Sequence, residues 1–172
     1  MRSLSAVIAA AVLVMSTPGS AGAATKTVKD DADDGAPGPA LDISAATLDS
    51  KQGVLKIRIE VGQVDSGGML VYLQPKGGAE YRASSDYDAN EGTLANTLYK
   101  GNAKVACKGL NAAWNTGKGT VSLRVPATCI EGGDYDKVRF KLLSEKANGS
   151  DNDFAPEDNK GYWKWSPYVA RG

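Results

Sequence analysis

Histidine is absent from this chain of 172 residues. Its absence excludes the Ser-His-Asp and Cys-His nucleophile systems and the zinc or copper sites that need an imidazole ligand. It also removes the side chain that most often acts as a general base near neutral pH. The sequence also lacks the motifs of the nucleophile elbow, the Ser-Lys dyad and the phosphate-binding loop. These absences argue against nucleotide chemistry and against the common hydrolase classes.

An excess of charge of either sign is lacking too. Lysine and arginine number 20, aspartate and glutamate number 20, and the formal net charge is zero. Such a balance creates no long-range field that would attract nucleic acid or an anionic membrane, so neither is an expected partner. Acid gathers only locally, in the segments "DDADD" and "SDNDFAPED".

Long apolar runs are limited to one, over residues 4–15. This run is shorter than the roughly 20 residues that a membrane-spanning helix requires. A basic residue precedes the run, and the small residues "AGA" follow it and end at Ala23. This order is typical of a secretory signal peptide, which we predict over residues 1–23. We therefore expect an exported, extracellular protein without a membrane span.

Cysteine occurs twice, as Cys107 and Cys129. In an exported protein this number predicts one disulfide bond, the alternative being two buried free thiols. A structural zinc site is excluded because it would need four soft ligands. The spacing is not Cys-x-x-Cys, so the predicted disulfide is structural and not a redox centre.

Alternating apolar and polar residues dominate the chain after the signal peptide. In "LKIRIEV", residues 55–61, the apolar side chains share one face, and "SKQG" joins this segment to "LDISAATLD" as a predicted hairpin. About nine short strands with closely spaced turn signals predict an antiparallel β-sandwich, immunoglobulin-like or jelly-roll-like. We expect an acidic and poorly ordered lead-in over residues 24–40, followed by a single domain over residues 41–172.

The segment between the cysteines predicts a second hairpin, with "NTGKGT" as its turn region. One register places the large apolar residues on a common face: Leu110 opposite Val125, Ala112 opposite Leu123 and Trp114 opposite Val121. The disulfide then closes the open end of the hairpin and stabilises the fold by about 3 kcal/mol.

Clustered aspartates near both ends of the mature chain suggest a cation site. Calcium prefers oxygen ligands from carboxylates and carbonyls, and the candidate ligands are Asp30, Asp31, Asp34 and Asp153. Neither acidic segment matches the EF-hand loop, so the alternative is a solvated tail at one end and a polar loop at the other. No cofactor is required, and calcium is the cation that these residues would suit.

Two tryptophans lie two residues apart in "GYWKWSPY". Strand alternation puts Trp163 and Trp165 on one face, with Tyr162 and Lys164 on the other. Exposed indoles on a common face form a stacking platform for sugar rings, whereas the same pair turned inward belongs to the core. The candidate ligand-binding residues are therefore Tyr162, Trp163 and Trp165, with core or half-core packing of the two tryptophans as the alternative.

The signal peptide, "DDADDG", "LKIRIEV", the cysteine-bounded hairpin and "DFAPEDNKGYWKWSPYV" together resemble a group of small secreted actinobacterial proteins, most of them without an assigned function. The resemblance covers the mature chain, implies a compact β-sandwich with one disulfide, and carries over no catalytic residue. More distantly, the acidic lead-in is similar to that of calcium-stabilised extracellular binding modules, some of which bind carbohydrate.

The sequence thus favours a non-catalytic binding or accessory module, with a polysaccharide or another cell-envelope polymer as its ligand. The alternative is an extracellular protein-interaction domain, such as an inhibitor or an envelope-assembly component. A hydrolase that uses a pair of carboxylates is the third class. We expect no enzyme, because most acidic residues fall in loops or on the polar faces of strands.

Overall fold

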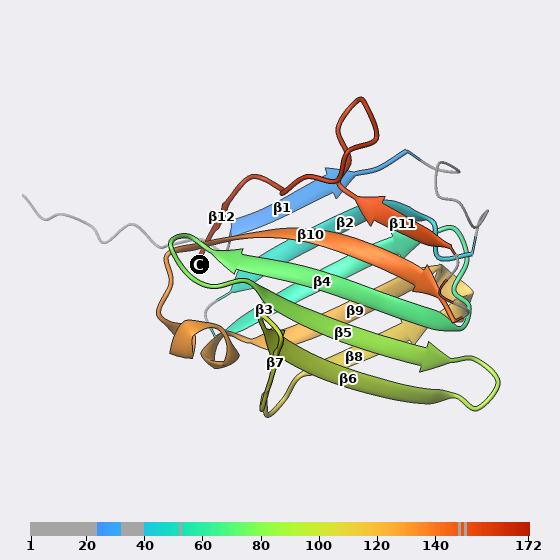
Figure 1. The fold of residues 1–172 in the computed structure, drawn as a ribbon, viewed down its shortest axis with the longest axis horizontal. Helices are drawn as coiled ribbons and strands as arrows, with labels where there is room; N and C mark the ends of the chain where they lie inside the picture. The colour runs from blue at the N-terminus through green and yellow to red at the C-terminus, as the bar shows by residue number, and fades with distance from the viewer. Residues whose placement is uncertain (1–23, 32–39, 52, 148, 150) are drawn as a thin grey trace, which may run out of the picture.

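The computed structural model describes residues 24–31, 40–51, 53–147, 149 and 151–172; the predicted signal peptide lies outside this range. Two antiparallel sheets pack face to face in a β-sandwich, as the alternation predicted (Figure 1). The five-stranded sheet has the order β1 (Ala24–Lys29), β2 (Ile43–Lys51), β3 (Val54–Val61), β9 (Thr120–Pro126) and β8 (Asn111–Asn115). No helix in the described ranges is long and apolar enough to cross a membrane.

The seven-stranded sheet forms the front layer in Figure 1. Its order is β11 (Asn152–Ala155), β10 (Lys137–Lys146), β4 (Gly67–Pro75), β5 (Tyr81–Asp88), β6 (Thr93–Lys100) and β7 (Ala103–Val105), and β12 (Val169–Ala170) also pairs with β10. The connection from β9 to β10 carries two short 3-10 turns, η2 (Ala127–Cys129) and η3 (Glu131–Gly133).

The core lies between the two sheets and takes one face of each strand. In β3, Ile57 and Ile59 are buried while Lys56 and Arg58 are exposed. The predicted hairpin of β2 and β3 is confirmed, with Leu48 opposite Ile57. Since side chains alternate across a strand, the outer faces of both sheets are free to carry polar and aromatic residues.

The first strand was not predicted. Residues 24–29 were assigned to a poorly ordered lead-in, but they form β1, which pairs with β2 from Ala24 opposite Ser50 to Lys29 opposite Ala45. The segment "ATKTVK" contains only one large apolar residue, Val28, so it shows little apolar alternation. An edge strand needs only one partner for its backbone and tolerates lysine and threonine, which explains the missed signal.

The disulfide between Cys107 and Cys129 is present, with a Cα–Cα distance of 5.5 Å. The hairpin of β8 and β9 has the predicted register, with Trp114 opposite Val121, although β8 begins at Asn111, one residue later than the predicted pairing. Gly119 adopts a φ of 58° at the end of the connecting 3-10 turn η1 (Thr116–Lys118), a conformation that favours glycine.

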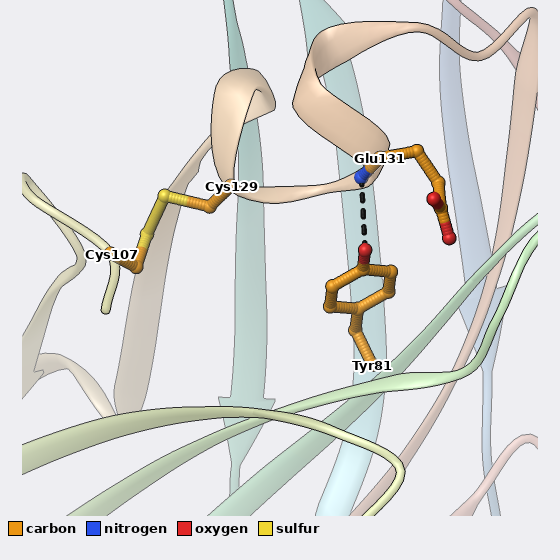
Figure 2. The surroundings of a disulfide bond; sticks show 4 residues. All are labelled: Tyr81, Cys107, Cys129 and Glu131. Carbon is orange, nitrogen blue, oxygen red and sulfur yellow. Dashed lines mark hydrogen bonds between the residues drawn. A yellow bond between two sulfur atoms is a disulfide. The ribbon is translucent and has the colours of Figure 1, made fainter. Parts of the chain in front are cut away.

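Next to the disulfide, Glu131 connects the linker to the seven-stranded sheet (Figure 2). Its backbone N–H donates a hydrogen bond of 3.0 Å to the Tyr81 hydroxyl. Its carboxylate accepts from the backbone N–H of Ala79 at 3.1 Å and pairs with Lys100 at 3.2 Å. These contacts, that from Ala79 first, hold the pKa of the Glu131 carboxyl below its ordinary value. The disulfide and Glu131 together fix the crossing between the sheets.

Candidate functional site

An alternating row of aromatic and cationic side chains crosses the outer face of the seven-stranded sheet. Tyr99 on β6, Arg82 on β5, Tyr72 on β4 and Lys141 on β10 are consecutive cross-strand neighbours. The Arg82 guanidinium carbon lies 4.6 Å from the centre of the Tyr99 ring, and the Lys141 ammonium lies 5.3 Å from that of Tyr72. Each cation therefore faces the negative surface of a ring.

The segment that follows β11 adds two indoles to this row. Trp163 packs edge to face on Tyr72 and tilted on Phe154, with 5.1 Å between ring centres in both pairs. The ammonium of Lys141 lies 3.9 Å from the centre of the Trp163 ring and 4.6 Å from that of Trp165. A single lysine thus contacts the rings of Tyr72, Trp163 and Trp165.

Arg139 extends the surface along β10. Its guanidinium carbon lies 4.8 Å from the Trp165 ring centre and 5.2 Å from that of Tyr168, and its Nε donates to Gln74 at 2.9 Å. We call the exposed and half-buried rings of this surface the aromatic face: Tyr72, Tyr99, Phe154, Trp163, Trp165 and Tyr168.

The two tryptophans that the sequence suggested as ligand-binding residues are thus neither buried in the core nor fully exposed. Trp163 and Trp165 are half-buried on the outer face, and both rings contact cations. Neither belongs to the core between the sheets, where Phe140, Tyr81 and Tyr135 are buried and where Tyr87 and Trp114 are partly buried. An indole held in this way keeps a fixed orientation while part of its ring remains open to solvent.

Tyr162, the third predicted ligand-binding residue, is 67% exposed. It belongs to the loop between β11 and β12, which projects beyond the edge of the sandwich (Figure 1). Asp158 accepts hydrogen bonds from the backbone N–H groups of Tyr162 at 3.0 Å and Lys160 at 2.9 Å. These bonds, that from Tyr162 first, lower the pKa of the Asp158 carboxyl. Asp158 therefore acts as the residue that shapes this loop.

The acidic segments from the two ends of the chain do approach each other. A hollow of about 300 Å³ is lined by Lys29, Asp30, Asp31, Glu157, Asp158, Asn159 and Gly161. The backbone N–H of Glu157 donates to the Asp30 carboxylate at 3.4 Å. Asp34, another candidate ligand, lies outside the described residues. Within the described ranges, no group of three or more acidic, cysteine or histidine side chains could hold a metal ion. The calcium site stays a prediction.

Asp153, the remaining candidate ligand, is not among the residues that line this hollow. It is 3% exposed, and its carboxylate accepts hydrogen bonds from the backbone N–H groups of Ile43 at 2.5 Å and Phe154 at 2.8 Å. Because Asp153 lies in β11 and Ile43 opens β2, the bond to Ile43 connects the edge strand β11 of one sheet to the start of β2 in the other. Its position is that of a structural residue.

Carboxylates also meet at a second hollow, at the far end of the seven-stranded sheet. A side chain on Gly68 would lie 3.2 Å from an oxygen of Asp86 and 3.2 Å from an oxygen of Glu145. Asp86 is exposed. A catalytic general acid needs a raised pKa, which burial away from water provides, so this pair is better explained as solvated surface.

No protein-family model matches the chain, and no curated protein matches it. The functional argument therefore rests on the surfaces of the chain itself. Sequence analysis missed Tyr72, Arg82, Arg139 and Lys141, although each occupies an outward position of an alternating strand. The alternation shows that these residues share a side of their own strand, but it does not show which strands are neighbours.

Proposed function

We propose that this protein is an exported, non-catalytic module that binds a polysaccharide through its aromatic face. The observation that carries the proposal is the concentration of tyrosine and tryptophan on one outer face, with Arg82, Arg139 and Lys141 between the rings. Aromatic rings stack on the C–H faces of sugars, and guanidinium and ammonium groups donate hydrogen bonds to hydroxyl oxygens. The predicted signal peptide and the disulfide support an extracellular location.

The geometry suits recognition because the rings are already oriented. Lys141 and Arg139 both contact the Trp165 ring, so binding a sugar chain requires little further ordering of the indole. Tyr162 on the projecting loop and Tyr168, which are 67% and 39% exposed, extend the aromatic surface beyond the sheet. A polymer of several sugars can contact more of these rings at once than a monosaccharide can.

Tryptophan fluorescence during titration with a panel of soluble polysaccharides tests the proposal. We expect a ligand to change the emission of the wild-type chain, and Tyr162→Ala to weaken binding without lowering Tm because Tyr162 is exposed. In the variant Trp163→Phe/Trp165→Phe the remaining tryptophan is Trp114, whose indole N–H is bonded to Ser85. We expect the emission change to vanish in this control. Unchanged emission of the wild type across the panel, together with no binding by calorimetry, would refute the proposal.

A protein-interaction role is the second candidate, and one feature of β6 favours it. In the described ranges β6 pairs with β5 along its whole length but with β7 only from Leu98 to Lys100. The first residues of β6 therefore form an open strand edge. Leu94 is one of them and is 38% exposed. Such an edge can accept an added strand from a partner. A stoichiometric protein partner, recovered from culture filtrate and lost on Ala95→Pro, would favour this role over glycan binding.

A further inference from the structure

A groove of about 410 Å³ crosses the outer face of the five-stranded sheet, opposite the aromatic face. All five strands contribute to its lining, from Thr25 on β1 to Asn111 on β8. At about 4.8 Å between neighbouring strands, the groove extends over about 19 Å. This length suits an extended chain of several units better than a single small ion.

Two basic residues stand directly opposite each other in the groove. Lys56 on β3 is the cross-strand neighbour of Arg124 on β9, and both side chains are exposed. Like charges at directly opposed positions destabilise a sheet. On its other side, Lys56 has Asp49 on β2 as its direct cross-strand neighbour, and Asp49 also lines the groove and pairs with Lys51 at 3.0 Å. Glu60 pairs with Arg58 at 3.5 Å. Among the residues that the structure describes, the groove therefore contains three basic residues, Lys56, Arg58 and Arg124, and one acidic residue, Asp49. An anion bound at Arg124 would relieve the repulsion between Arg124 and Lys56.

Apart from these charged residues and the buried Ile57 and Leu123, the lining consists of short polar and small side chains. Thr47, Ser122 and Ala113 flank Arg58 in one cross-strand row, and Asn111 follows Arg124 in the other. Hydroxyl and amide groups exchange hydrogen bonds with sugar hydroxyls, and the aliphatic stems of the basic residues offer apolar surface. The groove thus combines fixed positive charge with groups that suit a carbohydrate.

We propose that this groove binds a linear polyuronate, a polysaccharide that carries one carboxylate on each sugar. Arg124 and Lys56 bind successive carboxylates, Arg124 through the two parallel hydrogen bonds that a guanidinium forms with a carboxylate. The lining contains no aromatic side chain, so it offers single-stranded nucleic acid no stacking surface. The proposal is independent of the aromatic face and holds even if that face binds nothing.

The test compares Lys56→Gln/Arg124→Gln with Lys104→Gln/Lys108→Gln in the full mature chain. Both pairs remove two exposed positive charges, but Lys104 and Lys108 do not line the groove. We expect the groove variant to bind polygalacturonate at least about tenfold more weakly in calorimetry, because each lost charge-assisted bond weakens binding, and the control to bind like the wild type. The groove variant removes both the repulsion between Lys56 and Arg124 and the attraction between Lys56 and Asp49, so its Tm should stay close to that of the wild type.

Three outcomes would overturn the proposal: equal polygalacturonate affinity in wild type and groove variant, equal loss in both variants, or wild-type binding of uncharged dextran or duplex DNA as tight as that of polygalacturonate. The variant Trp163→Phe/Trp165→Phe should keep its polyuronate affinity. If that variant loses the affinity while the groove variant retains it, polyuronate binds the aromatic face and the groove proposal alone fails.

Discussion

Replacing Lys141 by glutamine removes one positive charge from the centre of three aromatic rings. The ammonium lies 3.9 Å from the Trp163 ring centre, 4.6 Å from that of Trp165 and 5.3 Å from that of Tyr72. Cation–π contacts contribute about 0.5–1 kcal/mol at exposed sites and about 2 kcal/mol when desolvated. Lys141 is half-buried, so we expect Lys141→Gln to reduce the free energy of unfolding by about 1.5 kcal/mol.

Urea denaturation followed by far-ultraviolet circular dichroism measures this loss, and a double-mutant cycle with Trp163→Leu isolates the part that the indole contributes. Thermal denaturation gives a second measurement, with an expected fall in Tm of about 3–6 °C for a chain of this size. Lys137→Gln is the matched control, because Lys137 is exposed on the same strand. Its effect should stay within about 0.5 kcal/mol.

The reasoning is wrong if Lys141→Gln unfolds at the same urea concentration as the wild type. It is also wrong if the coupling energy between Lys141 and Trp163 is below about 0.3 kcal/mol, the usual error of additivity. Lys141→Arg keeps the charge and should restore most of the stability. Failure of arginine to do so while glutamine destabilises would assign the effect to packing of the lysine stem instead.

Further perturbations test the disulfide, the pairing of Glu131 with Lys100, and the predicted cation site. Replacing Cys107 and Cys129 by alanine opens a loop of sequence separation 22 and should cost about 3 kcal/mol in urea denaturation; a cost below about 1 kcal/mol would contradict this. Folding lowers the pKa of Glu131. The stability that its carboxylate contributes is therefore present above the ordinary pKa of 4.5 and is lost as the pH falls through the folded pKa. The Tm difference between wild type and Glu131→Gln should therefore shrink in acid. Hydrogen bonding to Tyr81 and Glu131 raises the pKa of Lys100. The stability that the Lys100 ammonium contributes is therefore present below pH 10.5 and is lost as the pH rises through the folded pKa. Measuring Tm against pH checks the direction of both the Glu131 and the Lys100 effect. Calcium at 100 times its dissociation constant should stabilise the full chain by about 2.7 kcal/mol, and less in Asp31→Asn, whereas equal Tm in excess calcium and in chelator contradicts the site.

The parts of the fold that sequence analysis predicted are those with a strong local signal. The alternation in β3 and the register of β8 with β9 follow from apolar residues that must share a buried face, as Ile57 and Trp114 show. The strand β1 has only Val28 as a large apolar residue, so its pairing with β2 comes from backbone hydrogen bonds that leave little trace in the sequence. Local apolar patterning therefore predicted the central strands and missed the edge.

The candidate site shows the same division. Alternation placed Trp163 and Trp165 on a common face, and both contact Lys141. What surrounds the two tryptophans depends on β10 and β4 being neighbouring strands. This pairing joins residues that are about 70 apart in the chain, such as Lys141 and Tyr72. The aspartates were grouped by composition, yet Asp158 shapes a loop and Asp153 links β11 to the start of β2 in the other sheet. Composition shows that carboxylates are present, but it does not show which backbone N–H groups they bond to.

The two outer faces contain the same basic residue types in opposite electrostatic surroundings. On the seven-stranded sheet, Arg82 and Lys141 alternate with rings, so each charge is partly compensated within the protein. On the five-stranded sheet, Lys56 lies between Arg124 and Asp49, and the described lining of the groove contains more basic residues than acidic ones. Cations that face aromatic rings favour uncharged sugars that stack on those rings, whereas a groove with an excess of basic residues favours an anion. The proposals for the two faces therefore predict different salt dependence. Sodium chloride should weaken polyuronate binding in the groove strongly and should leave stacking on the aromatic face nearly unchanged.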